Sequence, residues 1–204
     1  MQYPRRGEPP TPTPSSDLEK RIKEAGDHPL GQLLEAERTG WHELLTLIES
    51  LTLEQDLEPD SFLEGWSVKD LLAHIACWFA EAGMVLEQIR GGTFHGRDLD
   101  VERMNAACVG ANRDQPMQII RAEAHAARSR MLGELDSLHE LTPDAEAWIR
   151  KAGPEHYAEH LPHLRDWVRE LRVIQSSSEA PKVIDLTTVP SLFAVEWQLP
   201  PVHD

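Results

Sequence analysis

Residues 66–92, WSVKDLLAHIACWFAEAGMVLEQIRGG, hold the most apolar stretch of the chain and its clearest helix signals. Ser67 is a typical N-cap residue, and Asp70 three positions later completes a capping box. Trp66 precedes them as a hydrophobic staple residue, and the glycine pair at 91–92 is a typical helix end. We therefore predict one long, largely buried helix over this stretch.

Segments of helical period lie on both sides of this helix. We predict long helices over about residues 29–51 and 154–174. Between them, a helical region begins near residue 98, is interrupted at 114–116 and resumes at 117, and a short helix begins at 142. Strand signals are absent from residues 20–175. The sequence therefore predicts an all-α body, residues 17–175, with four principal helices.

Both ends of the chain differ from this body. Residues 1–16 hold five prolines, which predicts a flexible tail. After SSSEAP at 176–181, apolar and polar residues alternate over 193–199, which is a strand period. We expect residues 176–204 to form an extended tail that drapes over the body or pairs with a second copy in a homodimer.

Composition excludes several functional classes. The chain of 204 residues has 35 acidic and 20 basic residues and a net charge of −15, which disfavours nucleic acids and anionic membranes as partners. No run of 18 apolar residues and no apolar leader are present. Two cysteines exclude a disulfide scaffold as the main support and fit a reducing cytosol. We therefore expect a cytoplasmic protein that acts on a small molecule.

The segment HYAEHLPH, residues 156–163, suggests a metal site. His156 and His160 are four apart, so they lie about 40° from each other around one helix. Two imidazoles so placed can bind one metal ion. Tyr157 stands where the metalloprotease helix motif has its glutamate, so this is a different motif. His163 is either a third ligand on the same face or an exposed residue, and the second interpretation is favoured.

A third histidine, His74, lies inside the apolar helix. It is either a hydrogen-bonded core residue or a ligand. With His156 and His160 it would form a three-ligand site with open positions, which is typical of a catalytic centre. Cys77 is either a thiolate ligand or a small buried residue, and Asp70 could orient His74 as well as cap the helix.

Three segments in order resemble the DinB-like superfamily: WSVKDLLAHIACW at 66–78, NAACVGANRDQP at 105–116 and HYAEHLPHLRDWV at 156–168. That superfamily includes YfiT-like proteins, the N-terminal domain of mycothiol-dependent maleylpyruvate isomerase and the ClbS/DfsB proteins. The resemblance covers about residues 28–175. It implies a four-helix bundle with one long crossover, which we place at 91–98.

The resemblance also implies a divalent metal, zinc, nickel or iron, bound by His74, His156 and His160. Asn105 matches the asparagine of the third-helix pattern and is expected to face the site. The segment 138–153 is shorter than in many relatives, and no separate domain like that of the isomerase follows, so the isomerase reaction itself is not expected.

The function that the resemblance implies is thiol transfer or hydrolysis on a small electrophile. The metal would activate a low-molecular-weight thiol or a water molecule. Tyr157 or Glu159 is a distant candidate for proton transfer, although Glu159 is expected to point away from the face of the two histidines. Two alternatives stay open: a ClbS-like module that captures a small metabolite in an apolar pocket, and a non-catalytic dimeric bundle. Binding that survives chelation would favour the capture module.

Overall fold

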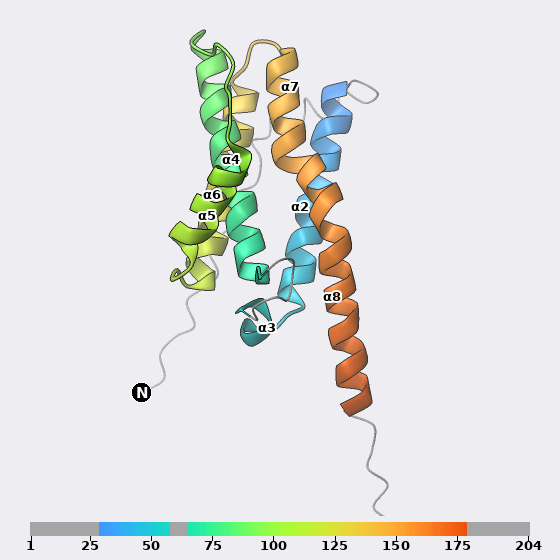
Figure 1. Cartoon of the computed structure of the whole chain (residues 1–204). Coiled ribbons are helices and arrows are strands. Elements are labelled where there is room, and N and C mark those ends of the chain that lie inside the picture. The colour runs from blue at the N-terminus through green and yellow to red at the C-terminus, as the bar shows by residue number, and fades with distance from the viewer. Residues whose placement is uncertain (1–28, 58–64, 179–204) are drawn as a thin grey trace, which may run out of the picture.

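The computed structural model describes residues 29–57 and 65–178, and every regular element in these ranges is helical (Figure 1). This confirms the predicted all-α class. The sequences assigned to the N-terminal tail, 1–16, and to the strand-like segment, 193–199, lie outside the described residues. The elements are α2 (Pro29–Glu49), α3 (Leu53–Leu57), α4 (Val68–Arg90), α5 (Val101–Asn112), α6 (Met117–Asp136), α7 (Pro143–Arg150), a π-helical turn (Lys151–Glu155) and α8 (His156–Ser178).

The ends of the helices follow local signals with two exceptions. The capping box at the start of α4 forms as predicted, and that helix ends at Gly91. The short helix α3 was not predicted, although Thr52 and Gln55 form a reciprocal capping box at its start. Helix α8 continues to Ser178, so the first three residues of the predicted tail at 176–204 are helical. Serines only weaken a helix, whereas the first strong breaker after them is Pro181.

Helices α4 and α6 run parallel, because contacts join their corresponding ends. Arg90 bonds Glu134 at 2.9 Å near the C-terminal ends, and the Lys69 ammonium bonds the Gln115 carbonyl at 3.2 Å near the N-terminal ends. The connection over 91–116 therefore returns along α4 and carries α5. Helices α2 and α8 run in the opposite direction (Figure 1).

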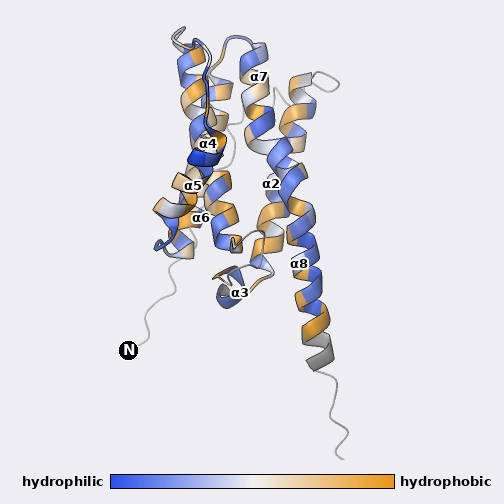
Figure 2. Cartoon of the chain, viewed as in Figure 1, coloured by the Kyte–Doolittle hydropathy of each residue, from blue (hydrophilic) through white to orange (hydrophobic). Residues whose placement is uncertain are grey.

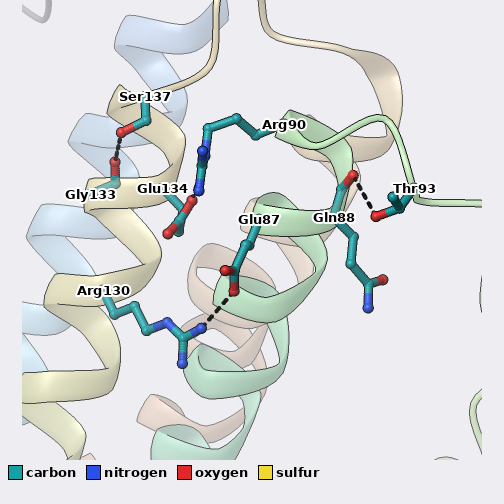
Figure 3. A network of polar contacts seen from close by, with 8 residues as sticks. All are labelled: Glu87, Gln88, Arg90, Thr93, Arg130, Gly133, Glu134 and Ser137. Atoms are coloured by element: carbon teal, nitrogen blue, oxygen red, sulfur yellow. Dashed lines mark hydrogen bonds and ion pairs between the residues drawn. The ribbon is translucent and has the colours of Figure 1, made fainter.

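Exposed polar contacts join the ends of α4 and α6 (Figure 3). Arg130 donates to Glu87 at 2.8 Å, and Arg90 to Glu134 at 2.9 Å. Exposed ion pairs of this kind contribute little to stability. The pairing of these helices must therefore depend on the apolar side chains between them.

The apolar core is centred on α4. Most of this helix is buried, including the large side chains of Trp78 and Phe79. Figure 2 shows apolar and polar positions together on each long helix, as expected for helices with one buried side. None of the helices in the described ranges has the length and apolarity to cross a membrane. Because His74 is part of α4, it lies in the most buried element of the described fold.

Helices α2 and α8 approach closely at a glycine. A Cβ atom at Gly40 would lie 2.1 Å from Cδ2 of Tyr157, so this contact requires a residue without a side chain. Tyr157 directly follows His156 in α8. The approach of α2 therefore helps to set the position of the histidine segment.

Candidate metal centre

The structure brings together the three histidines that the sequence analysis singled out. His74 comes from α4, and His156 and His160 come from α8. The Nε2 atoms of His74 and His160 are 3.3 Å apart, and one nitrogen of each histidine lies within 4.8 Å of the others. The side chains are 3%, 6% and 7% exposed. This is a buried cluster of three imidazoles that could hold a metal ion.

A π-helical turn places His156. Pro154 has no N–H, and its ring crowds the carbonyl four residues earlier, which favours a local distortion of the helix at this point. In the wider turn, the Lys151 carbonyl lies against Nδ1 of His156. A carbonyl can only accept, so Nδ1 carries the proton and Nε2 keeps its lone pair. The helix predicted over 154–174 begins two residues before α8, and Gly153-Pro154 is a signal for such a distortion.

Burial keeps these histidines neutral at physiological pH. Desolvation, followed by the nearby His156 and His160, lowers the pKa of His74 to about 3. Desolvation, followed by His156, lowers the pKa of His160 to about 4. The pKa of His156 is also lowered, chiefly by desolvation. Neutral imidazoles are the form that binds metals.

The geometry of the cluster fits a metal ion. Two nitrogens bound to a tetrahedral metal at about 2.05 Å are about 3.3 Å apart, which is the separation between His74 and His160. The other nitrogen of His74, Nδ1, is buried with no hydrogen-bond partner in the described residues. Three neutral imidazoles suit zinc, nickel, iron or copper.

Aromatic rings enclose the histidines. The Trp66 ring centre lies 5.0 Å from that of His74, and the Trp78 ring centre lies 4.9 Å from that of His156. Trp78 Nε1 donates to Oδ1 of Asn105 at 3.1 Å. Asn105, expected to face the site, therefore bonds an indole that packs against the cluster.

A pocket of about 690 Å³ lies beside the centre, between the start of α4 and the end of α5. Trp66 lines it, and the same indole packs on His74. Its other lining residues are Leu57, Gly65, Ser67, Lys69, Asp70, Val109 and Arg113. The volume is within the range of small-molecule sites.

Two further candidates have other partners. Tyr157 donates to Glu37 at 3.3 Å within a buried cluster that includes Arg128, and burial together with the Glu37 carboxylate raises the pKa of its hydroxyl. His163 is exposed and is not a member of the histidine cluster. Helix α8 continues through Pro162, which lies between Tyr157 and His163 in the sequence.

Cys77 forms a disulfide with Cys108, which joins α4 to α5. Its sulfur is therefore not the thiolate ligand that the sequence analysis considered, and that interpretation is corrected. The two cysteines are 31 positions apart. This spacing carries no signal for pairing, which depends on how 91–116 returns along α4.

Asp70 serves the helix cap. Its Oδ2 atom accepts from the backbone N–H of Ser67 at 2.9 Å and from the Ser67 hydroxyl at 2.7 Å. We expect Asp70→Ala to lower the free energy of unfolding by about 1 kcal/mol while metal affinity stays unchanged. Urea unfolding and metal titration of both proteins would measure this. A tenfold weaker affinity would instead indicate that Asp70 supports His74.

The lowered histidine pKa values predict the pH dependence of stability. Below the ordinary value of 6.5, the unfolded chain gains protons that the folded chain rejects until about pH 4. The free energy of unfolding of the metal-free protein should therefore fall as pH decreases from 6.5 to 4, by about 1.4 kcal/mol per pH unit for each of His74 and His160.

Urea unfolding in a chelator, compared with His74→Asn, would isolate this effect. Burial raises the pKa of Asp56 to about 6, which acts in the opposite direction but equally in both proteins. We expect the variant to have the shallower dependence. Identical slopes would show that His74 is not held neutral by the fold.

Fold and cluster together define a class of protein: the described residues form helices, and two of these helices bring three buried histidines together. A family model, the mycothiol maleylpyruvate isomerase N-terminal domain, matches residues 37–173. The chain belongs to this family, within the DinB-like superfamily, as the resemblance of its motifs predicted. No match was found among curated proteins or solved structures.

Proposed function

We propose that this protein binds a divalent metal ion through His74, His156 and His160 and acts there on a small electrophile, by thiol transfer or hydrolysis. The observation that carries this proposal is the 3.3 Å separation of two buried Nε2 atoms beside a third imidazole. Family membership supports the choice of a low-molecular-weight thiol as the co-substrate.

The chemistry follows from the donor set. A divalent metal held by three imidazoles keeps open positions and lowers the pKa of a bound thiol or water, which supplies a nucleophile near neutral pH. The Lys151 carbonyl holds the orientation of His156. The indoles of Trp66 and Trp78 limit the access of bulk water. The pocket lined by Trp66 would bind the electrophile.

We place this site in a four-helix bundle with one long crossover. Helices α2, α4, α6 and α8 would form the bundle. The crossover, which we predicted at 91–98, would then extend over 91–116 and include α5, and the parallel directions of α4 and α6 support this. A net charge of −15 supports a small-molecule substrate over a nucleic acid.

The test is thiol alkylation by the metal-loaded protein. Low-molecular-weight thiols, mycothiol among them, would be reacted with the fluorogenic electrophile monobromobimane at pH 6, where free thiols are mostly protonated. The hydrolytic alternative would use an activated ester. We expect the zinc- or nickel-loaded protein to accelerate one reaction by at least about 100-fold.

Two controls test whether the rate depends on the bound metal. Chelator and His156→Ala should each return the rate to background, whereas His163→Ala should keep it. A rate that survives chelation would contradict metal catalysis. Saturable binding of the electrophile without turnover, again unaffected by chelation, would favour a capture module.

A further inference from the structure

Helix α5 covers one side of α4 and adds only the partly buried Met104 to the edge of the apolar core. None of its residues is buried. It and its flanking segments are held by contacts in antiparallel order along α4. These are the Arg97–Glu81 ion pair, the Asn105–Trp78 hydrogen bond, the Cys108–Cys77 disulfide, and bonds from Lys69 to the carbonyls of Arg113 and Gln115.

These contacts lie next to the histidine cluster. Cys77 and Trp78 follow His74 by three and four residues, so all three share one side of α4. The Trp78 ring packs on His156 while its Nε1 bonds Asn105 of α5. The position of α5 therefore affects an indole that encloses the cluster.

Helix α5 also forms a wall of the pocket. Val109 and Arg113 line the pocket together with Lys69 and Asp70 of α4. The histidines themselves are at most 7% exposed. A substrate that reaches them requires some element to move, and α5 has no fully buried residue that would hold it in the core.

Apart from the main chain over 91–100, the disulfide is the one covalent link between α5 and α4 in the described residues. Because α5 has no fully buried side chain and only Met104 packs against the core, this link contributes much of its attachment. Both cysteines are half-buried, so a small thiol can reach them. They are the two cysteines of the chain, and no other thiol of the protein can rearrange the pair.

We propose that the Cys77–Cys108 disulfide is a latch that holds α5 over the histidine cluster, and that a low-molecular-weight thiol opens it. Only the choice of thiol rests on the proposed function. One thiolate attacks a sulfur of the pair, forms a mixed disulfide and expels the other cysteine as a thiolate, which takes up a proton. A second thiol displaces the protein sulfur and leaves with the first as its disulfide, which can re-oxidise the latch by the reverse exchange.

Hydrogen exchange of the full-length, metal-free protein tests the latch without any activity. Mass spectrometry would first count free thiols and detect the mixed disulfide after addition of glutathione. We expect the amides of 101–113 to exchange about tenfold faster or more in the reduced protein, while those of α4 change little. Cys108→Ser should resemble the reduced protein under all conditions, and the neighbouring Ala107→Ser should resemble the oxidised wild type.

Two results would overturn the latch: two free cysteines in the protein purified without reductant and exposed to oxidised glutathione, or equal exchange of α5 in both redox states. A second readout uses metal. Zinc-loaded protein should release its ion to a chelator faster when reduced, and equal release would also contradict the latch. If the protein takes up no metal, the proposed function fails, while the exchange experiment still decides on the latch.

Discussion

His160→Ala is expected to abolish tight metal binding while the protein stays folded. Elemental mass spectrometry of the untagged wild type after incubation with zinc or nickel should find about one ion per chain. The variant keeps only two of three imidazoles and replaces the Nε2 atom that lies 3.3 Å from that of His74. Loss of a ligand should weaken affinity by more than about 100-fold, since even supporting residues contribute ten- to a hundredfold.

The matched control is His163→Ala. This histidine lies one turn further along α8, is exposed, and is not a member of the cluster, so its removal should leave metal content unchanged. Circular dichroism of both variants would establish that α8 is intact. Equal metal content in wild type, His160→Ala and His163→Ala would place the metal elsewhere, and none in any of them would remove the proposed function.

The fold was predictable from local patterns because most of its helices carry their own signals. The Ser67–Asp70 capping box and Gly91 fixed the limits of α4 to within about a residue. The limits of α8 were harder to predict. A π-helical turn that contains Pro154 precedes its first turn. Its last turn lies in a run of serines, which only weakens a helix and does not end it.

The candidate site was predictable where it depends on spacing within one helix or on the motifs of the superfamily. His156 and His160 share a face by their four-residue spacing, and His74 was linked to them by the resemblance. The supporting contacts were not predictable in the same way. The Cys77–Cys108 disulfide and the Trp78–Asn105 hydrogen bond depend on the return of 91–116 along α4, which no local pattern specifies.

A buried ion pair that the sequence did not reveal supports the histidine-bearing helix. Glu37 of α2 is 1% exposed and accepts from Nε and Nη2 of Arg128 in α6, at 2.7 Å and 2.6 Å. The same carboxylate accepts from the hydroxyl of Tyr157, the residue after His156. Three helices therefore meet at one carboxylate, which explains why Tyr157 belongs to the framework of the site instead of its chemistry.

Glu37→Ala is therefore expected to destabilise the protein strongly. It leaves the mostly buried Arg128 guanidinium, whose side chain is 13% exposed, without its partner, and such a loss costs up to about 3–5 kcal/mol. For a protein of this size, the midpoint of thermal unfolding should fall by about 10 °C. Tyr157→Phe removes only the 3.3 Å hydrogen bond and should cost about 1 kcal/mol. Thermal and urea unfolding in the presence of a chelator would measure both effects without a contribution from bound metal.

The chain offers a matched control two turns along α2. Glu43 also faces an arginine of another helix, Arg165 of α8, with an Nη2–Oε2 distance of 2.8 Å, but both side chains are substantially exposed. Water replaces the lost partner there, so Glu43→Ala should cost less than about 1 kcal/mol. Equal losses in the two variants would mean that burial does not determine the weight of the Glu37 pair. Metal affinity should be measured for both variants as well. A lower affinity in Glu37→Ala but not in Glu43→Ala would mean that the buried carboxylate sets the position of α8, and through it the distances of His156 and His160 from His74.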